Sequence, residues 1–307
     1  MRQSYLKNAA LMTGADVLLR LAGMGLRIWL ANALGGEGMG LYQLVLAVYS
    51  LFVTLATAGV SVAATRLMAE ELARSPAEAR GMLHRLLLAG AGLGVLALAA
   101  QHEALYAALG MHPIVIEQHA DEGLAQLERC LSLRPPKLVA VGEIGLDLYR
   151  DDPQFDRQQA LLEEQLRLAK RYDLPVILHS RRTHDKLAML LKKHALPRTG
   201  VVHGFAGSLQ QAERFVQLGY KIGVGGTITY PRASKTREVM ARLPLSALLL
   251  ETDAPDMPLN GFQGQPNRPE QVARVFDALC ELRAESAPMI EAAVMANTKS
   301  LFSALAG

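Results

Sequence analysis

The chain has 307 residues, half of them hydrophobic, with 32 Lys and Arg against 29 Asp and Glu. A net charge of +3 is too small to indicate nucleic-acid binding by itself. The two cysteines, Cys130 and Cys280, lie far apart and predict reduced thiols rather than a disulfide framework. Residues 1–100 carry the whole positive excess, whereas residues 101–307 are neutral.

The first hundred residues have the pattern of membrane helices. Residues 38–65 contain no charged side chain, and about 20 apolar residues suffice to cross a bilayer. Residues 9–34 are also apolar but carry three charges on one helical face, which fits either a spanning helix facing a partner or a helix lying at the interface. Residues 86–101 form a third, shorter apolar run. Two or three membrane-like helices are therefore predicted.

This region resembles a known transporter family. The segments LRLAGMGLRIWLANALGGEGMGLYQL and AGVSVAATRLMAEE are similar to the N-terminus of polysaccharide flippases of the stage V sporulation protein B type. The resemblance implies a fragment, because such flippases use a dozen or more membrane helices and at most three occur here. The arginine-rich stretch 66–85 is predicted to be cytoplasmic by the positive-inside rule.

From residue 105 onward, short apolar runs alternate with amphipathic segments. Helices are predicted at 154–173 and 208–219, and strands at 105–110, 138–147, 175–180, 200–205, 220–226 and 247–253. Alternation of this kind predicts a parallel α/β fold covered on both faces. We expect an incomplete TIM (β/α)₈-type barrel with six of its eight strands, preceded by the membrane-like helices. A doubly wound open sheet is the competing architecture.

Four ionisable residues fall at the predicted carboxyl ends of different strands. They are Glu143, His179, His203 and Asp253. In a barrel these ends meet at the active face, and buried charge is costly unless it is paired or bound to metal. Oxygen and imidazole donors suit Zn²⁺, Mn²⁺ or a similar ion, and a bridging carboxylate would suit two-metal hydrolysis.

The same segments carry a second, specific resemblance. In order and spacing, AALGMHP, VAVGEIGLD, PVILHSR, GVVHGFAGS, IGVGG and LLLETDAP resemble the TatD family of metal-dependent hydrolases, nearest its YjjV-type members. The resemblance runs from about residue 95 to residue 307. It implies a TIM barrel with one or two divalent metal ions (Zn, Mn or Mg, which the sequence does not distinguish). It also implies a deoxyribonuclease acting on single-stranded DNA or another phosphodiester.

Roles for the four residues follow from that resemblance. Glu143 would bridge two ions, His179 and His203 would hold one of them, and Asp253 would bind the other and orient the attacking water. His112 is a candidate substrate contact or an exposed turn residue before Pro113. Arg181 either meets a phosphate or is a solvated charge. Arg182 is expected to be a solvated charge, and surface positions are expected for His84, His102, His119, His184 and His194.

The chain departs from the family at its start. The family's first strand ends in a His-X-His pair that supplies two ligands, and no such pair occurs among these 307 residues. The second strand is also missing. Residues 1–100 are thus expected to form a flippase-like membrane segment, and residues 101–307 a barrel with unpaired edge strands. We expect low or absent hydrolase activity.

Two rival interpretations remain at this point. The chain could be a membrane flippase fragment with a non-functional passenger, or a metal-dependent amidohydrolase of a small substrate, because the neutral charge of residues 101–307 shows no basic footprint for nucleic acid. The hydrolase part is expected in the cytoplasm, with membrane association if residues 1–100 are expressed with it. No protein partner is evident.

Overall fold

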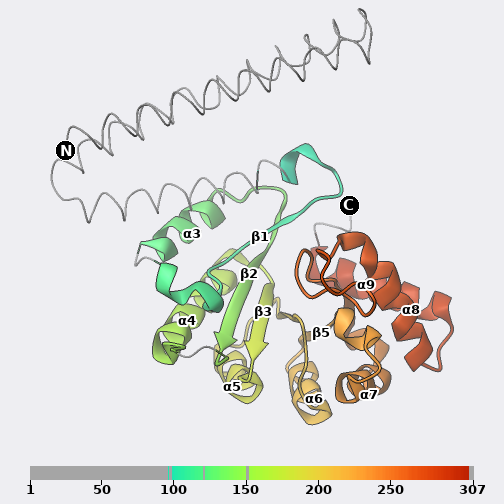
Figure 1. Cartoon of the computed structure of the whole chain (residues 1–307). Coiled ribbons are helices and arrows are strands. Elements are labelled where there is room, and N and C mark those ends of the chain that lie inside the picture. Colours follow the sequence, from blue (N-terminus) through green and yellow to red (C-terminus); the bar gives the residue numbers. More distant parts are fainter. Residues whose placement is uncertain (1–95, 97–98, 120–121, 150–151, 304–307) are drawn as a thin grey trace, which may run out of the picture. The chain divides into compact units, whose positions relative to one another are not determined.

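The computed structural model describes residues 96, 99–119, 122–149 and 152–303 (Figure 1). The chain divides into two compact units, residues 1–82 and 83–307. The first unit lies outside the described residues, as do the predicted membrane-like helices at 9–34 and 38–65. Among the described residues, no helix combines the length and apolar composition needed to cross a bilayer.

Within the described residues, six parallel strands form one sheet. Each strand pairs with the next along the chain, so the spatial order equals the chain order. The strands are β1 (Ala107–Leu109), β2 (Leu138–Asp147), β3 (Val176–Arg181), β4 (Gly200–Val202), β5 (Lys221–Val224) and β6 (Leu248–Leu250). A doubly wound sheet would reverse its order at a switch point, so the sequential order shows the TIM-barrel type of wall. Within the described residues, β1 and β6 each have a strand on one side only.

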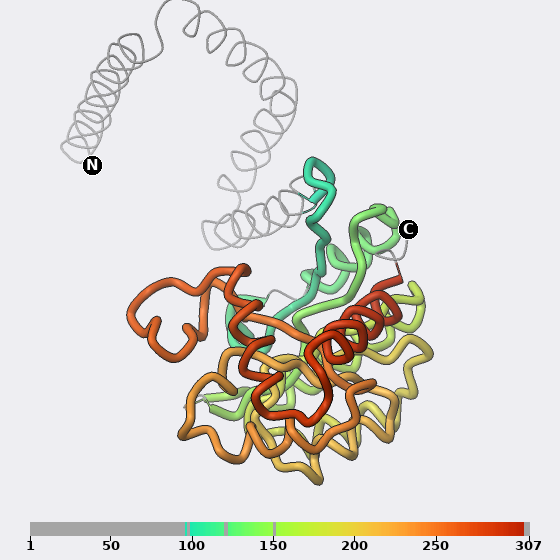
Figure 2. The backbone as a smooth tube through the Cα atoms, turned by 90° about the vertical axis from the view of Figure 1, so that its right-hand side faces the viewer, coloured from blue at the N-terminus to red at the C-terminus, as the bar shows by residue number. Residues whose placement is uncertain are grey.

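Helices follow the strands and cover the sheet (Figures 1 and 2). They are α3 (Gly123–Ser132), α4 (Phe155–Tyr172), α5 (His184–His194), α6 (Leu209–Gln217), α7 (Ser234–Arg242), α8 (Val272–Leu282) and α9 (Ala287–Leu301). Short 3₁₀ helices are η1 (Pro113–Gln118), η2 (Gly226–Thr229), η3 (Leu245–Ala247) and η4 (Pro269–Gln271). The two helices predicted from sequence match α4 and α6 closely. A capping box of Ser208 and Gln211 fixes the start of α6.

The core lies mainly between the sheet and these helices. Val176 and Leu178 of β3 are fully buried on the helix-facing side, together with Phe215 of α6. Ile177, between them, belongs to a smaller apolar cluster with residues of β4, β6 and the end of α9. Because successive strand side chains point to opposite faces, one apolar strand supplies both clusters. This is why the strands read as nearly continuous apolar runs.

Strand β2 does not end where the ionisable pattern suggested. Glu143 was predicted at the carboxyl end of its strand, but it is the sixth of ten residues in β2. The pairing of β2 with β3 shifts register between Val141 and Ile144, at the position of Glu143. Farther along, Gly145 has φ 155° and leaves no room for a side chain, because a Cβ there would lie 1.9 Å from the carbonyl oxygen of His179. The irregular strand therefore brings Glu143 and His179 close together.

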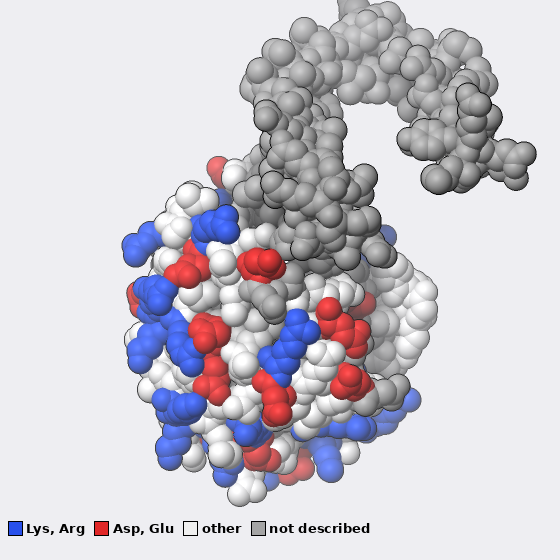
Figure 3. Space-filling model, turned by 90° about the vertical axis from the view of Figure 1, so that its left-hand side faces the viewer, with Lys and Arg blue, Asp and Glu red and all other residues white. Residues whose placement is uncertain are grey.

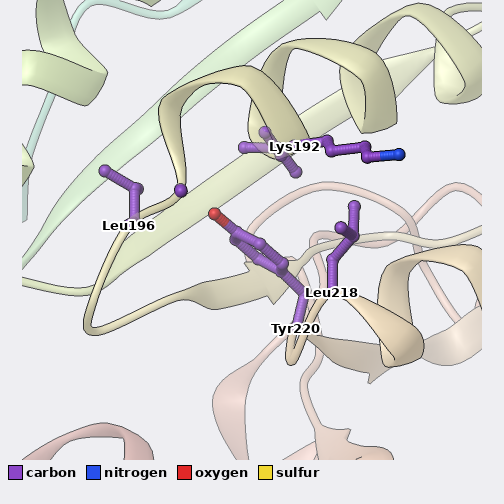
Figure 4. Close-up of a pocket in the computed structure, with 6 residues that line it drawn as sticks. Lys192, Leu196, Leu218 and Tyr220 are labelled. Carbon is purple, nitrogen blue, oxygen red and sulfur yellow. The ribbon is translucent and has the colours of Figure 1, made fainter.

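The amino-terminal end of the sheet holds a partly open, mostly apolar pocket of about 210 Å³. Tyr220, just before β5, lines it with Leu196, Leu218 and residues of α5. The Tyr220 side chain is 2% exposed, and its hydroxyl makes no hydrogen bond within the described residues. Figure 4 shows the hydroxyl pointing across the cavity toward the side where Leu196 lies. Burial raises the pKa of Tyr220, so the phenol stays neutral.

Candidate metal centre

In the part of the chain that the structure describes, two groups of possible metal ligands lie at the carboxyl side of the sheet and share one residue. The first group is His112, Glu143 and His179, and the second is Glu143, His203 and Asp253. Within each group, one donor atom from each residue lies within 4.8 Å of the others. All four residues predicted as ligands from the sequence are thus brought together, and Glu143 stands between the two groups.

His203 is held by a carboxylate behind it. Its Nδ1 donates to Glu251 Oε2 at 3.0 Å, and Glu251 Oε1 accepts from the backbone N–H of Gly204 at 2.7 Å. Gly223 permits this arrangement, because a Cβ there would lie 2.3 Å from Glu251. The bond fixes the ring so that Nε2 faces the centre, 3.3 Å from Asp253 Oδ1 and 3.7 Å from Glu143 Oε2.

The charge on His203 reflects these carboxylates. Burial would lower its pKa, but the hydrogen bonds to Asp253 and Glu251 and the nearby negative charges outweigh burial and raise the pKa to about 11. The imidazole is therefore protonated when only these side chains surround it. A divalent cation satisfies the same carboxylates and takes the place of that proton, so the donor set fits a metal ion.

His179 has a second carboxylate partner. Its Nε2 donates to Asp147 Oδ2 at 2.8 Å, which leaves Nδ1 as the possible ligand atom. Asp147 is fully buried, and its other oxygen accepts from the backbone N–H of Tyr149 at 2.7 Å. Burial lowers the pKa of His179 more than the Asp147 contact raises it. A neutral imidazole is the form that binds metal.

Glu143 stays ionised despite its surroundings. Burial would raise its pKa, but the hydrogen bond from His112 and the charges of His203 and His179 hold it below the usual range. Its side chain is 33% exposed, and that of Asp253 is 34% exposed. The centre is therefore open to solvent on the side where these two carboxylates lie.

His112 belongs to the first donor group. Its Nε2 is 3.3 Å from Glu143 Oε2, and its ring meets that of His179 edge to face with 4.6 Å between centroids. The backbone N–H of Ile114 donates to Nδ1 at 3.1 Å, as a cap of η1. His112 is thus half-buried beside the ligands rather than an exposed turn residue. Arg181 lies outside both groups, with its guanidinium 3.4 Å from the centre of the Tyr149 ring.

Some side chains differ from the sequence predictions. Asp147 and Glu251 received no role from sequence, although each lies within four residues of a predicted ligand in the same strand run. Their position in the same run as a predicted ligand was the signal that could have indicated these two carboxylates as histidine partners. His184 and His194 were wrongly placed at the surface. His184 is buried against Phe205 with 5.0 Å between ring centroids, and the His194 side chain is 11% exposed and contacts Glu163.

Charges on one face of the molecule are mixed in sign. On the face shown in Figure 3, lysines and arginines lie among aspartates and glutamates, without a broad area of one sign. This agrees with the equal numbers of positive and negative side chains in residues 101–307. Recognition of an anionic polymer would therefore depend on local groups near the centre.

Comparison with known proteins follows the division seen in the sequence. Residues 68–303 match the model of the TatD-related DNase family, and residues 5–104 match that of the polysaccharide biosynthesis protein family. The first match begins earlier than the expected residue 95, so the two overlap over residues 68–104. Different, overlapping parts of the chain are therefore similar to two families, as the resemblances in the sequence indicated.

Individual relatives agree with the first match. The chain is 76% identical over 208 residues to the uncharacterized metal-dependent hydrolase YjjV of Escherichia coli K12, covering 68% of this chain and 80% of that protein. It is 32% identical to the 3′-5′ ssDNA/RNA exonuclease TatD of Klebsiella pneumoniae, covering 72% and 87%. The crystal structure of E. coli YjjV superimposes with a TM-score of 0.68 at 75% identity, covering 69% of this chain and 82% of that one. The chain belongs to the TatD-related DNase family of metal-dependent hydrolases.

Proposed function

We propose that this chain is a divalent-metal-dependent phosphodiesterase that hydrolyses single-stranded DNA. The observation that carries the proposal is the pair of donor groups sharing Glu143. Two adjacent oxygen and imidazole sites with a common carboxylate suit two ions acting on one phosphoryl group. The exonuclease activity in the name of the Klebsiella relative supports a nucleic-acid substrate.

The proposed roles follow the geometry. Glu143 would bridge the ions, His179 and His203 would bind one, and Asp253 would bind the other and accept a hydrogen bond from the attacking water. A bound divalent ion supplies charge that polarises the phosphoryl oxygen and lowers the pKa of water. The chain's own carboxylates Asp147 and Glu251 hold the two imidazoles in a fixed orientation behind the ligands.

We further propose that the activity is lower than that of intact family members. Without a His-X-His pair, the second group offers a single imidazole, His203, beside two carboxylates. Glu143 and Asp253 are both about one-third exposed, so water competes for any ion between them. A site with fewer nitrogen ligands and more solvent holds its metal more weakly.

Substitution of Asp253 tests the assignment. We expect Asp253→Asn to reduce hydrolysis of a labelled single-stranded oligonucleotide by at least about a hundredfold, because it removes a charged ligand. Asp173→Asn is the matched control, since Asp173 is a 68% exposed residue at the end of α4. Metal content per chain is measured by mass spectrometry. Equal activity in wild type and Asp253→Asn, or wild-type activity equal to that of E. coli YjjV, would contradict the proposal.

The same assay separates the phosphodiesterase from a small-molecule amidohydrolase. Oligonucleotides, small amides and small esters are offered at equal concentration, each with and without Mn²⁺ or Zn²⁺. We expect turnover of the oligonucleotide only. If only amides were turned over, the chain would instead be an amidohydrolase that uses the same candidate ligands.

We propose that the chain has two parts. Residues 1–100 form a membrane-associating segment, and residues 101–307 form a hydrolase domain. The polysaccharide biosynthesis match to residues 5–104 supports a membrane-type first part, and the compact unit of residues 83–307 supports a separate hydrolase part. The hydrolase part would lie in the cytoplasm, tethered to the membrane when both parts are expressed together. Recovery of the full chain from cell extract without detergent would argue against tethering. A chain that needs detergent and binds no divalent metal would favour a flippase fragment with a non-functional passenger.

A further inference from the structure

A groove lies on the same rim as the metal ligands but outside both donor groups. It holds about 590 Å³ and is lined by residues that follow β2, β3 and β4 and by the start of α7. Because these segments all come after the carboxyl ends of strands, the groove opens on the catalytic side of the sheet. None of its lining residues belongs to either ligand group.

The groove carries an uncompensated positive charge. Arg182, Lys186 and Lys235 line it, and within the described part of the chain none of the three forms an ion pair. The acidic residue of the lining, Asp185, is already paired with Arg214 at 3.1 Å and accepts from Gln211 at 2.8 Å. The amino termini of α5 and α6 also open into the groove and add the positive ends of their dipoles. The local chemistry favours an anion such as a phosphate.

An exposed aromatic platform adjoins the groove. Tyr149 is 55% exposed, with the guanidinium of Arg181 at 3.4 Å and that of Arg182 at 4.8 Å from its ring centre. Arg182 is therefore shared between the platform and the groove lining. Planar aromatic and guanidinium groups layered in this way form a surface on which nucleobases stack.

The platform is connected to the metal centre through one side chain. Asp147 accepts from the backbone N–H of Tyr149 with one oxygen and from His179 Nε2 with the other. One carboxylate therefore holds both the backbone beneath the platform and the imidazole of His179.

We propose that this surface binds the part of a single-stranded nucleic acid adjacent to the phosphate at the metal centre. A nucleobase stacks on the platform of Tyr149 and Arg181, and the next phosphate lies in the groove among Arg182, Lys186 and Lys235. This inference rests on the proposed phosphodiesterase function. The groove supplies a local positive charge, whereas residues 101–307 as a whole are neutral.

Binding without catalysis provides the test. Anisotropy of a fluorescein-labelled oligothymidylate of about 12 nucleotides, within the range of single-strand sites, is measured with the full chain in mild detergent and EDTA. We expect Tyr149→Ala to weaken binding about tenfold, and Tyr149→Phe to bind as wild type because it keeps the ring. Lys186→Ala and Lys235→Ala each weaken binding several-fold and lower the salt slope by about one. Arg182→Asn, which suits the positive φ of 60°, behaves like the lysine variants.

Arg242→Ala is the charge control, because Arg242 lies 60% exposed in the last turn of α7, away from the rim. The proposal is overturned if wild type does not bind the oligonucleotide, if the groove variants bind as wild type, or if Arg242→Ala weakens binding equally. Hydrolysis of bis(p-nitrophenyl) phosphate with Mn²⁺ reports on the ligand groups alone. A wild type that hydrolyses neither this diester nor the oligonucleotide defeats the phosphodiesterase assignment, whereas unchanged binding by the groove variants defeats only the groove.

Discussion

The two ends of the sheet are built from opposite kinds of interior. At the carboxyl end, carboxylates and imidazoles pair with one another, and Asp147 and Glu251 orient the histidines. At the amino-terminal end, Tyr220 lines a mostly apolar pocket, and its buried hydroxyl makes no hydrogen bond within the described residues. The polar groups at the first end are arranged for ligands, whereas the packing at the second end serves stability. Changes at the carboxyl end should therefore alter metal and substrate binding, and changes elsewhere should alter unfolding.

The largest effect is expected beneath the carboxyl rim. Phe215 of α6 is fully buried and packs edge to face against Phe205 at 6.3 Å. Phe215→Ala should lower the free energy of unfolding by about 3–5 kcal/mol, because it leaves a cavity in the core. Chemical denaturation measures this. Tyr149→Ala removes an exposed aromatic from the rim and should change stability by less than about 0.5 kcal/mol. If both variants lost similar amounts of free energy of unfolding, the expected difference between core and rim would be wrong.

Asp147 should affect metal binding through His179. Asp147→Asn keeps the shape of the side chain but removes the charge that orients the imidazole, so we expect metal affinity to fall about 10- to 100-fold. Competition with a chromophoric chelator gives the dissociation constant. Asp156→Asn, in the first turn of α4, is the control for loss of one negative charge. Unchanged affinity in Asp147→Asn would show that His179 needs no partner.

A substitution at Tyr220 is expected to raise the free energy of unfolding rather than lower it. Its buried hydroxyl has no hydrogen-bond partner within the described residues, so Tyr220→Phe should raise the free energy of unfolding by about 1 kcal/mol. Tyr230→Phe is the matched control, because the Tyr230 hydroxyl donates to the carbonyl of Pro258 at 2.6 Å, and its loss should destabilise the chain by about 1 kcal/mol. Equal destabilisation by both changes would mean that the Tyr220 hydroxyl has a partner, such as water in the cavity.

The smallest effect concerns pH. Contacts from Lys193, Gln159 and His194 lower the pKa of Glu163 from 4.5 to about 2 in the folded chain. The stabilisation is therefore complete above pH 4.5 and is lost as the pH falls toward 2, by about 0.5–1 kcal/mol. Glu163→Gln should flatten this part of the stability curve, measured by denaturation at stepped pH. Glu213→Gln, on the exposed side of α6, should leave the change of stability between pH 4.5 and pH 2 as it is in wild type. If the stability of Glu163→Gln changed with pH as steeply as that of wild type, the contacts of Glu163 would not cause the change.

Much of the candidate centre could be read from residue types and strand ends. His179, His203 and Asp253 follow apolar runs, and parallel strands deliver such residues to one rim. The positions of Asp147 and Glu251 could not be read in this way. Both lie in the same runs as predicted ligands, and whether their side chains meet a histidine depends on pairing with a neighbouring strand. Pairing register is non-local, so sequence spacing does not set it.

By itself, the sequence determined the alternation of strand and helix, the α/β class and the resemblance to two families, and it predicted the four candidate ligands. Those features depend on local periodicity and on residue types that chemistry restricts. Only the tertiary structure decided that Glu143 lies within β2 and that His112 lies beside Glu143. The structure also decided that the guanidinium groups of Arg181 and Arg182 lie over the Tyr149 ring, beside a groove. Each of these depends on which side chains from separate strands come together, because folding places them in contact over long sequence separations.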